Sequence, residues 1–213
     1  MNTDDLIQTL SANVSRVSRR ALARRLAVGM VGGGIVTMIL VTAILGIRPD
    51  LRVAMHGFSF WMKWTYTVSL GVGAIFAVSR LARPTQASLR WLWLLAVPVL
   101  LLAGISIGEL ADKPSREWLA MWLGGSWKVC PWLVLTLAMP IFVGLLWSFR
   151  RLAPTRLRAA GAAAGLAAGA WAATIYCLHC PEVSAIFVLT WYSLGIVLAA
   201  GIGALLGPKL MRW

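Results

Sequence analysis

Charged side chains are scarce in this chain of 213 residues, and acidic ones are the scarcest. Charged residues make up 13% of the sequence, whereas a soluble domain usually carries about 25%. Hydrophobic residues make up 60%, and the mean hydropathy is +0.79. A hydrocarbon core about 30 Å thick requires about 20 apolar residues per crossing helix. The composition therefore excludes an ordinary soluble domain and predicts an integral membrane protein.

Motifs of enzymes and transporters are also missing. The sequence has no nucleotide-binding loop and no hydrolase nucleophile motif. No charged residue lies at the middle of an apolar run, which argues against an ion or proton path and against a small transporter. We therefore expect a protein that is not an enzyme and has no cofactor. The net charge of +13 would suggest nucleic acid in a soluble protein. In a membrane protein it is typical of cytoplasmic loops, so we expect no direct nucleic-acid binding.

Six long apolar runs follow a polar amino-terminal segment. They cover roughly 26–46, 60–79, 91–108, 129–147, 159–178 and 184–206. The sequence predicts an all-α, polytopic membrane protein: residues 1–25 form a cytosolic partner-binding segment, and residues 26–213 form a bundle of six transmembrane helices. In the fifth run, Gly161, Gly165 and Gly169 recur at a spacing that lets helix backbones approach closely.

Basic residues are concentrated in alternate loops. They gather in segment 1–25 and in the second loop, the fourth loop and the carboxyl-terminal tail. The intervening loops carry the acidic residues Asp50, Glu109, Asp112, Glu117 and Glu182. Lys63 and Glu109 lie near run ends, where long side chains reach the interface. The excess of arginine on one side predicts that both termini are cytoplasmic.

Residues 1–25 have the pattern of an amphipathic helix. Thr3 can cap it, and Asp4 and Asp5 occupy its first turn, where carboxylates favour the helix dipole. The apolar stripe consists of Leu6, Ile7, Leu10, Val14 and Val17. Such a helix either lies on anionic lipid or fills a groove on a cytosolic protein. The two acids favour a protein partner, because a purely lipid-binding helix has no use for them.

The three cysteines lie at the ends of apolar runs. With both termini inside, Cys130 and Cys180 face the same outer compartment, which in a bacterium is the oxidising periplasm. Cys177 lies one helical turn deeper, and His179 lies between Cys177 and Cys180 in the sequence. These cysteines could form a structural disulfide, act as small buried hydrophobic side chains, or serve as a redox or metal sensor. Cys177 to Cys180 is also formally a dithiol motif. A tetrahedral metal site with His179 is possible in principle, but nothing fixes one, and we expect a solvated loop histidine and no metal.

Segments along the whole chain resemble the NrsF-like membrane anti-sigma factors of Gram-negative bacteria. The most specific are His179-Cys180-Pro181-Glu182 and the closing Gly-Pro-x-Leu-x-Arg-Trp pattern within 206–213. The other matching parts are Thr3-Asp4-Asp5-Leu6-Ile7 with Leu10, and residues 46–51, 127–130 and 191–195.

The resemblance implies that the chain holds an extracytoplasmic-function (ECF) sigma factor at the bacterial inner membrane and releases it under stress. The sigma-binding residues would be Thr3, Asp4, Asp5, Leu6, Ile7 and Leu10. Cys130 and Cys180 match the family pattern and would be the outward sensor, to which Cys177, an extra thiol, and His179 could contribute. We hypothesise that a change at these thiols shifts the fourth transmembrane helix against the fifth. The alternative is a membrane thiol oxidoreductase that uses the same cysteines with a quinone.

Overall fold

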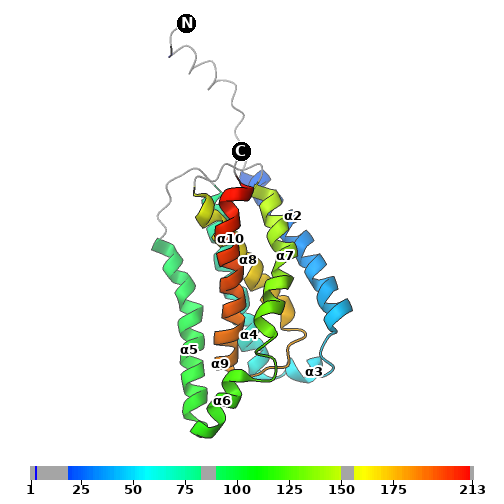
Figure 1. The fold of residues 1–213 in the computed structure, drawn as a ribbon, viewed down its shortest axis with the longest axis vertical. Helices are drawn as coiled ribbons and strands as arrows, with labels where there is room; N and C mark the ends of the chain where they lie inside the picture. Colours follow the sequence, from blue (N-terminus) through cyan, green and yellow to red (C-terminus); the bar gives the residue numbers. More distant parts are fainter. Residues whose placement is uncertain (1–2, 4–18, 83–89, 150–155, 212–213) are drawn as a thin grey trace.

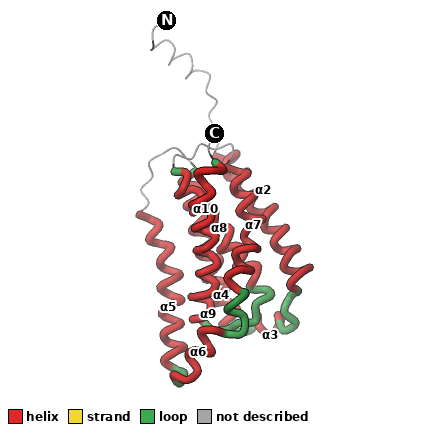
Figure 2. Tube along the Cα trace, viewed as in Figure 1, coloured by secondary structure: helices red, strands yellow, loops and turns green. Residues whose placement is uncertain are grey.

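A computed structural model describes Thr3 and residues 19–82, 90–149 and 156–211 of the chain. The described residues form helices joined by turns, with no strand among them (Figure 2). The helices are α2 (Arg19–Leu40) continued by η1 (Val41–Leu45), α3 (Leu51–Ala54), α4 (Phe58–Leu81), η2 (Arg90–Leu95) continued by α5 (Ala96–Ala111), α6 (Ser115–Leu123), α7 (Cys130–Phe149), α8 (Leu157–Tyr176), α9 (Ala185–Phe187), η3 (Val188–Tyr192) and α10 (Ser193–Leu210). The predicted all-α class is confirmed.

The long helices run alternately from one end of a bundle to the other (Figure 1). The beginning of α2 and the end of α10 lie at the same end, which we call the termini end. The short helices α3 and α6 lie at the opposite end, together with loop 177–184, and we call this the loop end. Every carboxylate of the described residues belongs to a segment at the loop end. The bundle therefore has two chemically different ends.

Five helical segments of the described chain are long and apolar enough to cross a membrane. They are Ala23–Leu45, Leu92–Ala111, Cys130–Phe149, Leu157–Tyr176 and Ala185–Leu210. The run predicted at 60–79 forms α4, which is 24 residues long but is not among these five because Lys63 and several hydroxyl side chains lower its hydropathy. A membrane protein with several spans is supported, and the number six stays a prediction.

Helix α8 occupies the centre of the bundle because its small side chains let neighbours approach. Of the 18 most apolar consecutive residues of α8, 72% are buried inside the bundle. The helix packs on α10, α4 and α7. A methyl group added at Gly161 would overlap the carbonyl oxygen of Gly203 on α10. On the other side of the bundle, Gly29 of α2 and Gly144 of α7 face each other equally closely. Packing through small residues is what the glycine spacing predicts.

Candidate functional site: a buried thiol cluster

The three cysteines gather at the loop end. Cys130 is the first residue of α7, Cys177 follows α8, and Cys180 lies in loop 177–184. All three are free thiols, and their exposed fraction is 0%. The Cys130 and Cys180 thiols are close enough for a hydrogen bond between them to be the largest influence on the ionisation of Cys180. The structure thus brings together the two thiols that the sequence predicts on one side.

Glu182 links the cysteine loop to the turn before α7. Its Oε1 atom accepts hydrogen bonds from the backbone N–H groups of Gly125 and Ser126, at 2.8 and 3.1 Å, and from Ser126 Oγ at 3.0 Å. The carbonyl of Ser126 in turn accepts the N–H of Cys130 at 2.9 Å. Gly124 closes this turn with a φ of 55°, and a side chain there would overlap the Glu182 carboxylate. Movement of Glu182 is therefore coupled to the start of α7.

Lys63 is buried against the same loop, which corrects the expectation that it reaches the membrane interface. Its side chain is 1% exposed, and Nζ donates to the carbonyl oxygens of Cys180 at 3.2 Å and Glu182 at 2.6 Å. A buried ammonium group is costly unless it is hydrogen-bonded. The carbonyls of loop 177–184 supply these bonds, so Lys63 holds the loop on the first turns of α4.

Arg48 holds the loop from another direction. Its Nη1 atom donates to the carbonyl oxygen of Cys180 at 3.3 Å, and its backbone N–H donates to that of Leu178 at 3.1 Å. Two further hydrogen bonds, of 2.7 and 2.6 Å, join the guanidinium to both carboxylate oxygens of Asp50. This bidentate pair orients Arg48, and the hydrogen bond to Arg48 lowers the pKa of Asp50.

His179 is half-buried, so the prediction of a solvated loop histidine is wrong. Its Nδ1 atom lies 2.9 Å from the carbonyl oxygen of Gly46, so this nitrogen carries the proton. The ring also packs on Tyr176, with 5.7 Å between ring centroids. The described residues contain no group of three or more His, Cys, Asp or Glu side chains placed to hold a metal ion. The geometry gives no support to a tetrahedral site at His179.

The thiols of loop 177–184 have different electrostatic surroundings. A hydrogen bond from Cys130 lowers the pKa of Cys180, and the positive charge of Lys63 and the Tyr192 hydroxyl act in the same direction. Burial raises the pKa of Cys177 to about 11. The buried hydroxyl of Tyr192 has no well-aligned hydrogen-bond partner among the described residues. It lies beside the thiols of Cys177 and Cys180. Because the thiolate is the reactive form, Cys180 is better placed to react than Cys177.

Helix α7 connects the thiol cluster with α2, a contact that the sequence does not reveal. Thr37 Oγ1 on α2 donates to the carbonyl oxygen of Leu137 at 3.0 Å. Nearer the termini end, Ser148 Oγ on α7 donates to the carbonyl oxygen of Arg25 at 3.0 Å. The helix that begins with Cys130 therefore packs along the helix that follows the amino-terminal segment.

The proposed sigma-binding residues cannot be placed against this cluster. Asp4, Asp5, Leu6, Ile7 and Leu10 lie outside the described residues, and Thr3 is described only as an exposed helical residue. Near the cluster, Glu109 Oε2 accepts the N–H of Ala185 at 2.7 Å. The sequence alone does not distinguish this inward-facing role of Glu109 from an interfacial one.

Comparison with known proteins shows similarity over the full length. Residues 10–213 match the family described as "NrsF: Negative regulator of sigma F". The "Probable anti-sigma-F factor NrsF" of Azospira oryzae is 41% identical over 214 residues, which cover 100% of both chains. The "Anti-sigma-F factor NrsF" of Caulobacter vibrioides is 39% identical over 215 residues, again with 100% of both chains covered. No solved structure matches the chain.

Proposed function

The chain belongs to the NrsF family of negative regulators of a sigma factor, and from this we propose that it is a membrane-bound anti-sigma factor controlled by its thiols. It sequesters an ECF sigma factor through residues 1–25 and releases it when Cys130 and Cys180 change state. The observation that carries the proposal is the full-length family match together with the pairing of these two buried thiols.

The proposed orientation places the termini end in the cytoplasm of a bacterium and the loop end in the periplasm. Arg24, Arg25, Arg80 and Arg158 belong to the termini end, whereas all the described carboxylates belong to the loop end. Because arginine accumulates on the cytoplasmic side, this distribution supports six spans in the inner membrane with both termini inside. The thiols then face an oxidising compartment.

The proposed sigma contact is the amphipathic helix at the amino terminus. Leu6, Ile7 and Leu10 would fill an apolar groove on the sigma factor. Asp4 and Asp5 would pair with basic residues of the partner, and Thr3 would cap the helix. Residues 19–25 of the same segment form the first turns of α2.

The signal in this proposal is a bond or a soft ion joining Cys130 and Cys180. In the oxidative form, the Cys180 thiolate attacks a peroxide oxygen and displaces hydroxide, which leaves a sulfenic acid on Cys180. The Cys130 thiol then attacks that sulfur, forming the disulfide and releasing water. In the metal form, a soft cation binds both sulfurs after they lose their protons. Either event draws the first turn of α7 towards loop 177–184.

Movement of α7 against its neighbours would carry the signal to the cytoplasm. The predicted shift of α7 against α8 remains part of the proposal. The hydrogen bonds from Thr37 to Leu137 and from Ser148 to Arg25 suggest that α2 moves with α7. The two ends of the bundle would then form a two-state system in which thiol state and sigma affinity are coupled.

Replacing the thiols one at a time tests the proposal. With Cys130→Ser or Cys180→Ser, we expect stress-dependent release of the sigma factor to change, while the variants still retain it in pull-downs from solubilised membranes. Cys177→Ser is the matched control, because it removes a buried thiol outside the pair. Deletion of residues 1–25 should abolish retention. Normal induction in both serine variants would rule out the thiol switch.

A membrane thiol oxidoreductase remains the second candidate, since Cys180 has a lowered pKa beside a second thiol. It predicts turnover of a dithiol with quinone and requires no cytosolic partner. The pull-down, repeated with and without a thiol oxidant, separates the two functions. Only the anti-sigma function makes recovery of a sigma factor depend on residues 1–25 and on the oxidant.

A further inference from the structure

Helices α4 and α5 are separated by an apolar crevice whose lining includes none of the three cysteines. It comprises a cavity of about 730 Å³ and an adjoining one of about 270 Å³. The two share Ser69 of α4 and Pro98 and Leu101 of α5. Of the 18 most apolar consecutive residues within Leu92–Ala111, only 11% are buried. Helix α5 therefore lies loosely against the rest of the bundle. The larger cavity is within the range of about 300–1,000 Å³ that is usual for ligand sites.

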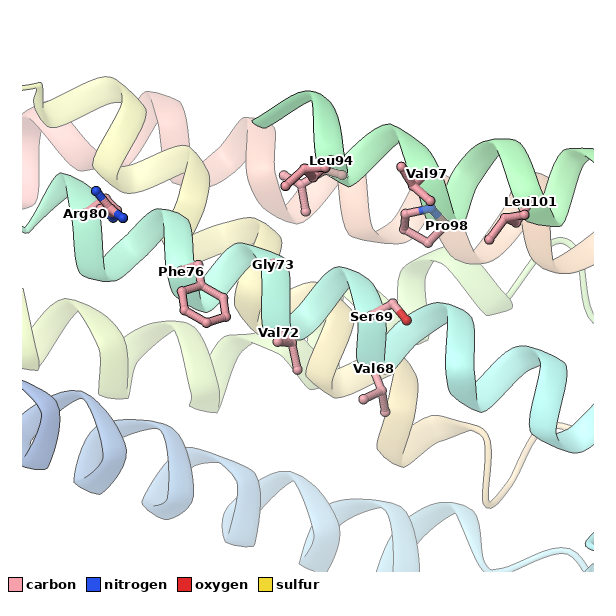
Figure 3. A pocket seen from close by; sticks show the side chains of 11 residues that line it. Val68, Ser69, Val72, Gly73, Phe76, Arg80, Leu94, Val97, Pro98 and Leu101 are labelled. Atoms are coloured by element: carbon pink, nitrogen blue, oxygen red, sulfur yellow. The ribbon is translucent and has the colours of Figure 1, made fainter. Parts of the chain in front are cut away.

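The larger cavity is apolar along its length and ends in a single positive charge. Val68, Val72 and Phe76 line it from α4, and Leu94, Val97, Pro98 and Leu101 line it from the opposite helical segment. Figure 3 shows Arg80 at one end of the row of α4 side chains and Val68 at the other. Arg80 lies near the last residue of α4, at the termini end.

The length of this cavity matches one leaflet of a bilayer. A helix rises 1.5 Å per residue, so the segment from Val68 to Arg80 covers about 18 Å. This is slightly more than half of a hydrocarbon core about 30 Å thick. At Gly73 the two helical segments approach closely, because a methyl group there would overlap the Leu95 side chain across the crevice.

We propose that this crevice binds one anionic phospholipid, with an acyl chain between α4 and α5 and the phosphate on Arg80. A guanidinium pairs with two phosphate oxygens at once, and basic residues at the membrane surface attract anionic lipid. Among the described residues that line the larger cavity, Ser69 and Arg80 alone have polar side chains, so the rest of the lining suits an acyl chain. The site is independent of the proposed anti-sigma role, and it places a lipid contact on the helix that also carries Lys63.

Native mass spectrometry of the purified full-length protein tests this site. The probes are phosphatidylglycerol and phosphatidylcholine with identical acyl chains. We expect the wild-type protein to retain one phosphatidylglycerol in preference to phosphatidylcholine. Arg80→Gln should reduce this preference about fivefold, the effect of one basic residue at an anionic surface. Ser69→Phe fills the crevice from an exposed position and should abolish retention of both lipids, as should Val72→Trp.

Arg158→Gln is the matched control, because Arg158 is an exposed arginine at the termini end that does not line the crevice. It should leave lipid retention unchanged. Equal retention of the two lipids by the wild type, or equal losses in Arg80→Gln and Arg158→Gln, would overturn the proposal. So would a protein dimer that Ser69→Phe dissociates, since a second copy would then occupy the crevice. Thermal unfolding of each variant identifies any that fail to fold, and Val72→Trp replaces Ser69→Phe in that case.

Discussion

Lys63 and Arg48 donate hydrogen bonds to the same atom, the carbonyl oxygen of Cys180, at 3.2 and 3.3 Å. Lys63 belongs to α4, and Arg48 belongs to the loop that follows η1. Two positive side chains from separate parts of the chain therefore fix the position of one cysteine. Any reaction that moves Cys180 must also disturb its hydrogen bonds with Lys63 and Arg48. Loop 177–184 therefore connects α8 with α4 and with the loop after α2 and η1.

Lys63→Met should destabilise the fold. The substitution keeps the apolar stem but leaves the carbonyl of Glu182 without the Nζ donor, and an orphaned buried acceptor costs about 1–3 kcal/mol. We expect the free energy of unfolding in detergent to fall by about that amount. Lys113→Met is the control, since Lys113 is exposed at the same end and surface substitutions usually change stability by less than about 0.5 kcal/mol. Equal stability of the two variants would show that the Lys63 hydrogen bonds contribute little.

The pH dependence of Cys180 alkylation should also depend on Lys63. The pKa of Cys180 is lowered by its hydrogen bond with Cys130 and by the charge of Lys63, so the thiolate persists to lower pH than an ordinary thiol allows. Removing the charge in Lys63→Met should move the midpoint of the alkylation rate to higher pH. Mass spectrometry of Cys180 after iodoacetamide treatment measures this midpoint. Cys177, whose pKa is raised to about 11, is the internal control, and an unmoved Cys180 midpoint would contradict the assignment.

The long helices are predictable because membrane crossing imposes a strong pattern on the sequence. The run at 129–147 becomes α7, and the alanine- and glycine-rich run at 159–178 becomes the central α8. Helix α4 is long enough to cross a membrane, but its most apolar stretch is less apolar than those of the other long helices. Its hydroxyl groups and Lys63 lower its hydropathy, but Lys63, Tyr66 and Thr67 are buried in the bundle. Thr67 Oγ1, for example, accepts a hydrogen bond from Thr174 at 3.0 Å.

The thiol site is predictable only in part. Loop topology is enough to place Cys130 and Cys180 on one side, because each lies at a run end. Most partners of Lys63, Glu109 and Glu182 are backbone groups of distant segments, and backbone carbonyls and N–H groups leave no residue-specific signal in a sequence.

Contact between α2 and α7 should depend on the absence of side chains at Gly29 and Gly144. Gly144→Ala places a methyl group against the backbone of Gly29, and overpacking of this kind costs about 1–3 kcal/mol. Gly32→Ala is the control on α2, because nothing lies within 4 Å of a methyl group there. It should be neutral or stabilising by up to about 1 kcal/mol, since alanine favours a helix. Similar unfolding temperatures for the two variants would contradict the close approach of these helices.

The orientation of the bundle can be tested only with introduced cysteines, because all three native thiols are buried and a bulky impermeant maleimide cannot report on them. In a chain whose native cysteines are replaced by serine, Asp112→Cys provides an exposed thiol at the loop end and Arg158→Cys one at the termini end. With a periplasmic loop end, an impermeant maleimide added outside cells with a permeabilised outer membrane labels Asp112→Cys. It labels Arg158→Cys only after the inner membrane is disrupted. The opposite pattern would place the thiol pair in the reducing cytosol, where a disulfide does not persist, and would remove the physical basis for an oxidative signal at Cys130 and Cys180.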